Sequence, residues 1–140
     1  MDDVVLERLT LLRNEVADLK TQADHLLLLR DYVNDTRLRR ATERGLQITV
    51  ELCADIARRI IAIEGFRYPD DYQDTFRVLG EEGVVSNELL PRLTEMARFR
   101  NLLVHIYAKI DDAKVYGILK NRLGDFDAFA AAIAAYLERA

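Results

Sequence analysis

The N-terminal part of the chain carries the pattern that most restricts its fold, because apolar side chains return every three or four residues without a break. Neither glycine nor proline occurs in the segment 3–30. Its apolar members are Val5, Leu9, Leu12, Val16, Leu19, Ala23 and Leu26. This spacing places them on one face of an α-helix. We therefore expect one amphipathic helix over residues 3–30, packed against other helices along that face.

The same spacing returns in a second segment and predicts a helix over residues 36–64. Its apolar line is formed by Leu38, Ala41, Gly45, Ile48, Leu52, Ile56, Ile60 and Ile63. Glycine costs a helix about 1 kcal/mol relative to alanine, but it lets a neighbouring helix approach closely. We therefore expect Gly45 to lie at a close contact between helices.

Two breakers follow the second helix. Gly65 and Pro69 end it, and Asp70 is placed to cap a short helix over residues 71–79. A carboxylate at this position accepts hydrogen bonds from the first free backbone N–H groups of a helix. The short helix is therefore expected to start just after the proline.

The C-terminal half is predicted to contain two further helices. One starts at Ser86 or Leu90, with Pro91 tolerated in its first turn. The apolar positions beyond it keep one phase across Gly124, which favours a single helix over residues 112–138. No useful run alternates with the two-residue period of a strand. We expect an all-α bundle of four main helices and one short helix.

Length and composition limit the setting of this bundle. With 140 residues, the chain has the usual length of one domain, and residues 1–140 are expected to form it. Cys53 is the single cysteine, which excludes an intrachain disulfide and fits a reducing compartment. The start, Met1-Asp2-Asp3, is acidic where a signal peptide is basic, and the longest apolar run, 26–29, is too short to span a bilayer. We expect a cytoplasmic protein without a membrane segment.

Charge is unevenly distributed along the chain. The net charge of −4 argues against a general nucleic-acid coat protein, although a local phosphate site remains open. Arg37, Arg39, Arg40 and Arg44 fall close together at the start of the second helix. Such a run usually forms a solvated helix face. Arginine also suits bidentate phosphate contacts, so weak binding of a polyanion is the second interpretation.

The main candidate site lies at the end of the helix that begins near Ser86. The apolar positions of this helix include Leu89, Leu93, Met96 and Leu103. Their spacing predicts another apolar residue at the position that Arg100 occupies. Asn101 and His105 are spaced to share one face of the same helix. Desolvating an arginine costs several kcal/mol unless it is paired or reaches water. Either an acid neutralises Arg100 or it lines a solvated cleft for an anion, and the cleft is the favoured interpretation.

His105 is the best candidate for proton transfer near neutral pH. The other histidine, His25, lies beside the apolar face of the first helix and is expected to be structural. Asp55 lies near the apolar line of the second helix and is an alternative partner for an arginine of the cluster. The acids that follow Pro69 could hold a cation, but capping and a solvated turn explain them better.

The motif and its setting resemble a known family. The segment Phe99-Arg100-Asn101-Leu102-Leu103-Val104-His105-Ile106-Tyr107 is preceded by Tyr68-Pro69-Asp70-Asp71-Tyr72 and followed by Val115-Tyr116-Gly117-Ile118-Leu119. Together these segments resemble the HepT toxins of the HEPN superfamily, over nearly the whole chain. That family has the signature arginine, four residues, histidine, one residue, tyrosine. Arg100, His105 and Tyr107 match it, and Asn101 matches the polar residue that usually follows the arginine.

The resemblance implies a HEPN-type bundle and an activity. It implies a metal-independent ribonuclease toxin of a type VII-like system, with tRNA as the expected target and Arg100, Asn101 and His105 as the catalytic set. The four clustered arginines would then be weak RNA contacts. The toxin would act as a homodimer and need no cofactor. An MntA-like minimal nucleotidyltransferase antitoxin would transfer AMP from ATP to Tyr107. The alternative is a catalytically silent helical adaptor that partners a nucleotidyltransferase.

Overall fold

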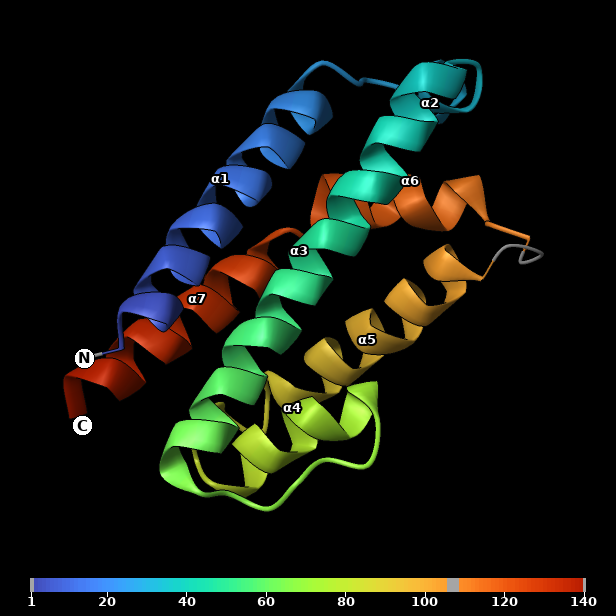
Figure 1. Ribbon diagram of the computed structural model, residues 1–140. Helices are drawn as coiled ribbons and strands as arrows, with labels where there is room; N and C mark the ends of the chain where they lie inside the picture. The colour runs from blue at the N-terminus through green and yellow to red at the C-terminus, as the bar shows by residue number, and fades with distance from the viewer. Residues whose placement is uncertain (1, 106–108, 140) are drawn as a thin grey trace.

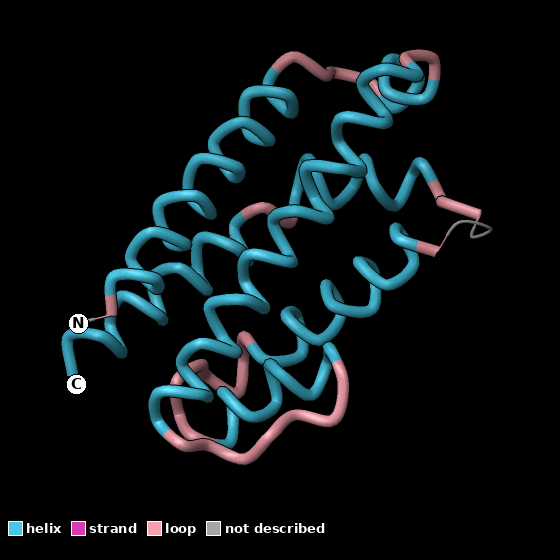
Figure 2. The backbone as a smooth tube through the Cα atoms, in the orientation of Figure 1, coloured by secondary structure: helices cyan, strands magenta, loops and turns pink. Residues whose placement is uncertain are grey.

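The computed structural model describes residues 2–105 and 109–139 and contains only helices and loops within them (Figures 1 and 2). The helices are α1 Asp3–Asp24, α2 Leu29–Val33, α3 Thr36–Glu64, α4 Tyr72–Glu81, α5 Leu90–Val104, α6 Asp112–Asn121 and α7 Gly124–Arg139. The all-α class is confirmed. Seven helices stand in the described part of the chain, where the sequence predicts four main helices and one short one.

The long helix α3 is the axis of the molecule. It packs against α1 on one side and against α4 and α5 on the other, while α7 lies along α1 (Figure 1). The helices enclose one apolar core, whose largest fully buried side chains include Phe76, Phe126 and Phe129. Within the described residues, no helix is both long enough and apolar enough to cross a membrane.

Aspartates start most of the helices, as local chemistry dictates. Asp2, Asp35, Asp71 and Asp111 each accept a backbone N–H with their side chain at the start of α1, α3, α4 and α6. At α4 the cap is therefore Asp71, one residue after the predicted Asp70. Gly65 ends α3 in the left-handed conformation, with φ at 68°, a geometry that other residues rarely adopt.

The predicted first helix is too long. It ends at Asp24, and a separate short helix, α2, follows, although Leu26 still contributes to the core. The reason lies far along the sequence. Lys120 Nζ donates to the carbonyl oxygens of Ala23 and Leu26, at 2.8 and 2.7 Å, and so satisfies acceptors that a continuing helix would have used. Apolar spacing alone does not reveal such a stop.

The predicted single C-terminal helix is also wrong, because a corner at residues 121–124 divides it into α6 and α7. Asp125 is buried behind this corner and accepts hydrogen bonds from Arg122 at 2.9 Å and from Arg92 at 3.2 Å. Leu123 is buried at the corner itself. The apolar residues therefore keep their phase while the chain changes direction, which periodicity cannot distinguish from a straight helix.

Gly45 lies at a close helix contact, as expected. A Cβ atom built on it would come within 3.0 Å of Leu19 Cδ2 on α1. The helix carrying the main candidate site starts at Leu90 with Pro91 in its first turn, also as expected. Ser86 precedes that helix and accepts the backbone N–H of Leu89 at 3.1 Å.

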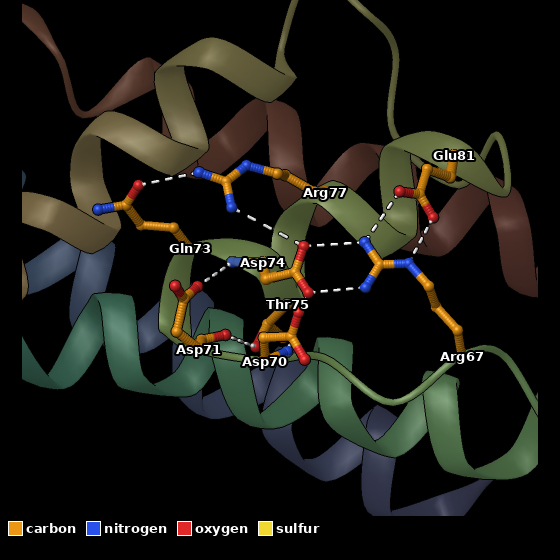
Figure 3. A network of polar contacts seen from close by, with 8 residues as sticks. All are labelled: Arg67, Asp70, Asp71, Gln73, Asp74, Thr75, Arg77 and Glu81. Carbon is orange, nitrogen blue, oxygen red and sulfur yellow. Dashed lines mark hydrogen bonds and ion pairs between the residues drawn. The ribbon is translucent and has the colours of Figure 1, made fainter.

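An ion-pair network fastens the loop between α3 and α4 (Figure 3). Arg67 donates to both oxygens of Asp74, at 2.7 and 2.8 Å, and to both oxygens of Glu81, at 2.8 Å each. Asp74 also accepts the backbone N–H of Asp70 at 2.9 Å. The side chain of Asp74 is 8% exposed and that of Arg67 is 41% exposed. This network holds the loop that leads into Tyr72, which contacts the candidate site.

Candidate functional site

The candidate site is built on the C-terminal end of α5. Arg100 is in the last turns of the helix, and His105 is its C-cap, where the backbone becomes extended at φ −81° and ψ 115°. The backbone N–H of His105 still donates to the carbonyl of Leu102 at 3.3 Å. His105 and Asn101 are exposed, whereas Arg100 is half-buried. Tyr107, the third residue of the signature, lies outside the described residues.

Arg100 is held by three neighbours. Its Nη2 and Nε donate to Glu51 Oε1 on α3, at 3.1 and 3.3 Å, and its Nη1 donates to Asn101 Oδ1 at 3.2 Å. Its Cζ lies 4.4 Å from the centroid of the Tyr72 ring. The sequence left two alternatives, an acidic partner or a solvated cleft, and favoured the cleft. The structure shows the acidic partner, and the side chain of Arg100 keeps 23% of its surface exposed.

Glu51 is charged at neutral pH. Partial burial alone would raise its pKa, but hydrogen bonds from Gln47, at 2.9 Å, and from Arg100 outweigh burial and hold the pKa below its ordinary value. Among the described residues, Glu51 is therefore the counter-charge that the guanidinium meets, and that carboxylate is shared with Gln47. Surface remains open on Arg100 for a second anion, so binding of an oxyanion is chemically available here.

Tyr72 supplies an aromatic surface to two arginines. The Cζ atoms of Arg58 and Arg100 lie 4.8 and 4.4 Å from its ring centroid, within the range of cation–π attraction. Burial raises the pKa of Tyr72 to about 12, so its hydroxyl stays protonated and neutral under physiological conditions. Tyr72 therefore fixes the direction of the Arg100 side chain without neutralising its charge.

Asp55 is not the acid that meets Arg100. Its Oδ1 contacts Arg58 Nη1 at 3.4 Å, one turn along α3, and both side chains are about half exposed. Glu51, one turn earlier on the same helix, takes the role that the sequence considered for Asp55. Both acids border the buried face of α3, so the argument that singled out Asp55 applied equally to Glu51. Only packing against α5 distinguishes the two.

The four clustered arginines do not form one surface. Arg39 turns into the junction of α2, α3 and α6, where it donates to the carbonyl of Val33 at 2.8 Å and to Asp112 at 3.4 Å. Arg37, Arg40 and Arg44 are exposed on α3. Arg39 therefore has an architectural contact, and only the other three present charge to solvent.

The acids after Pro69 serve the fold, as the sequence favoured. Asp71 caps α4, and Asp74 is occupied by Arg67. Among the residues that the structure describes, no three histidine, cysteine or acidic side chains come together as metal ligands. His25 is exposed at the end of α1, and its Nδ1 lies 2.7 Å from the carbonyl of Thr21.

Sequence reasoning missed Glu51, Tyr72 and Arg58. Glu51 reaches Arg100 across 49 positions, and Tyr72 reaches it from a third helix. The signal for Tyr72 was its place in the segment 68–72, which supported the resemblance but was given no role. The assembled group combines an arginine for an oxyanion with a histidine at the end of the same helix. Phosphodiester cleavage by a 2′-hydroxyl requires a proton acceptor, a proton donor and a cation for the phosphate, and one chain offers here one proton carrier and one cation.

Comparison with known proteins assigns the chain to a family. A family model described as ribonuclease HepT-like matches residues 11–133. The chain belongs to this HepT-like family. The mRNA nuclease HepT of Shewanella oneidensis is 28% identical over 98 residues, which cover 70% of this chain and 74% of that protein. The HepT-like assignment made from the motif is thereby confirmed.

Solved structures confirm the HEPN fold of this HepT-like chain. The tri-AMPylated HEPN toxin of Shewanella oneidensis, in complex with its MNT antitoxin, matches with a TM-score of 0.88. It is 23% identical, and the match covers 96% of this chain and 99% of that chain. YutE of Bacillus subtilis, described as a cytosolic protein of unknown function, matches with a TM-score of 0.82, 21% identity and coverage of 96% and 89%.

Proposed function

We propose that this protein is an endoribonuclease toxin that cleaves RNA without a metal ion, with Arg100 and His105 as its catalytic residues. The observation that carries the proposal is the partly exposed Arg100, oriented by Glu51 and Tyr72, in the last turns of the helix that His105 caps. Membership of the HepT-like family supports the same assignment. Asn101 positions the guanidinium through its Oδ1.

The proposed reaction uses the 2′-hydroxyl of RNA as the nucleophile. Its oxygen attacks the adjacent phosphorus, a bond to the 2′-oxygen forms, and the bond to the 5′-oxygen breaks. One histidine accepts the 2′-hydroxyl proton and another donates a proton to the leaving oxygen, while arginine binds the charged phosphoryl oxygens. The products are a 2′,3′-cyclic phosphate and a 5′-hydroxyl. Each chain supplies a single His105, so two copies are needed for both proton transfers.

The exposed side of α5 supports a homodimer. Leu102 and Val104, 38% and 42% exposed, stand among the polar residues Asn101 and His105 at the end of this helix. The opposite side of α5 packs on α3 and α4 (Figure 1). A two-fold contact through this end covers the apolar side chains and brings two Arg100 and His105 sets to one cleft.

Sedimentation is expected to show a dimer at micromolar concentration. A stable monomer that still cleaves RNA contradicts this arrangement.

The test of the proposed activity is cleavage of RNA by the purified chain in excess chelator. Arg100→Ala and His105→Ala are each expected to reduce the rate by about 100-fold or more, with helicity and thermal unfolding close to those of the parent. Arg98→Ala, an exposed arginine on the same helix, and His25→Ala are the matched controls and should retain the rate. Full activity of both site variants, or a strict magnesium requirement, refutes the proposal.

The substrate and the antitoxin belong to the same proposal. We expect tRNA as the target, and the name of the Shewanella relative makes mRNA the comparison substrate, so both should be followed after induction of the chain in bacteria. A neighbouring MntA-like nucleotidyltransferase is expected to neutralise the toxin by transferring AMP from ATP to the Tyr107 hydroxyl, which releases pyrophosphate. An inactive wild-type chain that still binds such an enzyme favours the silent adaptor instead.

A further inference from the structure

A cavity of about 490 Å³ opens beside the candidate site and has no part in the scheme above. It lies between the C-terminal part of α3 and the loop that leads into α4. Its volume is within the usual range of small-ligand sites. Ile61, Phe66 and Pro69 contribute apolar surface to its lining. The cavity therefore offers apolar contact to part of a ligand.

The cavity adjoins the Arg100 contact through a shared residue, Tyr72. Tyr72 and Arg58 line it, and the Tyr72 ring that carries Arg58 at 4.8 Å also carries Arg100 at 4.4 Å. A ligand group in the cavity and an anion on Arg100 would thus be separated by a single side chain. Neighbouring parts of one nucleotide chain, a base and a phosphate, have this relation.

Tyr68 provides the surface on which a base could stack. It lines the cavity, and 89% of its surface is exposed. This is the highest exposure among the large hydrophobic residues in the described part of the chain. Its loop is nevertheless anchored through the neighbouring Arg67 and its bonds to Asp74 and Glu81 (Figure 3). An exposed tyrosine on an anchored loop is a ready stacking platform. Bases of every kind stack on an aromatic side chain, so such a platform binds single-stranded nucleic acid without requiring one base.

Charge at the cavity favours a base over a second phosphate. Asp70 and Asp71 lie on its lining with Arg58, and Asp71 already accepts the backbone N–H of Asp74 at 2.7 Å. Carboxylates repel phosphate but accept hydrogen bonds from the N–H groups at base edges. Arg100, which contacts Tyr72 but does not line the cavity, remains the place for phosphate.

We propose that this cavity holds a base of single-stranded RNA next to the phosphate on Arg100, with Tyr68 as the stacking residue. The inference rests on the proposed ribonuclease function and adds a subsite that selects the position of cleavage. Tyr68 here binds substrate and takes no part in proton transfer.

The test uses an oligodeoxynucleotide with one ribonucleotide, which confines cleavage to a single 2′-hydroxyl, and replaces one flanking base at a time by an abasic sugar. At one flanking position the abasic substrate is expected to raise KM of the wild type by about ten-fold, at nearly unchanged kcat. Tyr68→Ala should raise KM equally, and the abasic change should then have no further effect. Tyr68→Phe keeps the ring and should behave as the wild type, as should Leu27→Ala, which removes another strongly exposed side chain.

Failure of this subsite is distinguishable from failure of the ribonuclease. The subsite is refuted, and the activity stands, if the wild type cleaves the substrate but neither Tyr68→Ala nor the abasic site raises KM. It is also refuted if the two changes combined raise KM by the product of their separate effects. If the wild type cleaves no RNA, the subsite is tested by following the binding of the all-deoxy oligonucleotide by NMR. Shifts of the Gly65 and Tyr68 amides that vanish with the abasic oligonucleotide support the subsite alone. Their absence refutes it.

Discussion

Replacement of Asp74 by asparagine tests whether the loop beside the site depends on the Arg67 network. The carboxylate accepts two hydrogen bonds from Arg67, at 2.7 and 2.8 Å, and one from the backbone of Asp70 at 2.9 Å. In Asp74→Asn one oxygen becomes an NH₂ group, which faces the donors of the guanidinium. The change keeps the size of the side chain, so the effect comes from hydrogen bonding and charge rather than from a cavity.

The expected loss follows from the contacts. A hydrogen bond to a charged group contributes about 1.5–3 kcal/mol, and the larger value is discounted because the Arg67 side chain is 41% exposed and can recover water. We expect the free energy of unfolding at pH 7 to fall by about 2 kcal/mol. For a chain of this length, that corresponds to a fall in Tm of roughly 7 °C.

The loss should depend on pH with a defined sign. Hydrogen bonds from Arg67 and from the Asp70 backbone hold the pKa of Asp74 well below its ordinary range. A carboxyl group of this kind stabilises the folded state fully above the ordinary aspartate pKa, about 3.9, and loses that contribution as the pH falls towards its folded value. The difference between wild type and Asp74→Asn should therefore be constant from pH 7 to pH 5 and shrink below about pH 4.

The assay is denaturant unfolding followed by circular dichroism, repeated at several pH values between 7 and 3. Asp70→Asn is the matched control, because it makes the same chemical change four residues away, on the loop before α4, and keeps the backbone N–H that donates to Asp74. It should change the free energy of unfolding by less than about 0.5 kcal/mol. Equal stability of Asp74→Asn and wild type at pH 7, or a difference that persists unchanged at pH 3, refutes the reasoning.

Three further outcomes are expected. Gly117→Ala should stabilise the protein by about 0.5–1 kcal/mol, because a Cβ there meets nothing within 4 Å. Gly45→Ala should stabilise it less or destabilise it, because its Cβ would lie 3.0 Å from a side chain of α1. Thermal unfolding of the two variants and the wild type measures the difference. Glu51→Gln removes the counter-charge of Arg100 and should lower KM for RNA by about two- to five-fold, while a raised KM would show that Glu51 mainly positions the guanidinium. Tyr107→Phe should keep most of the ribonuclease activity but escape neutralisation by a co-expressed nucleotidyltransferase, and AMP found by peptide mass analysis only on other tyrosines would contradict this role.

Local interactions explain what was predictable. Helix α3 has the predicted bounds because its apolar period, the Asp35 cap and the Gly65 stop all act within a few residues. The close contact at Gly45 was also predictable, since a glycine on an apolar helix line has few other uses. The signature at Arg100 and His105 identified the family for a different reason. Its residues lie close together in the chain at the end of one helix, so the motif can be recognised without knowing how the helices pack.

Contacts between distant segments explain what was not. The stop of α1 depends on Lys120, and the corner between α6 and α7 depends on a buried aspartate that two arginines hold. Neither changes the apolar period that the prediction used. The choice of Glu51 over Asp55 as the acid beside Arg100 is of the same kind. One helical turn separates the two acids, and only the position of α5 against α3 decides between them.

By itself, then, the sequence determined an all-α chain of amphipathic helices, most of their boundaries, and a HepT-like motif at the end of one of them. Tertiary structure decided that Arg100 has a carboxylate and an aromatic partner, that Arg39 contacts Asp112, and that a cavity adjoins Tyr72. The physical reason is the distance along the chain over which each kind of interaction acts. Period, caps and breakers act over about four residues, whereas the electrostatic surroundings of a side chain are set by whichever helices the core brings together.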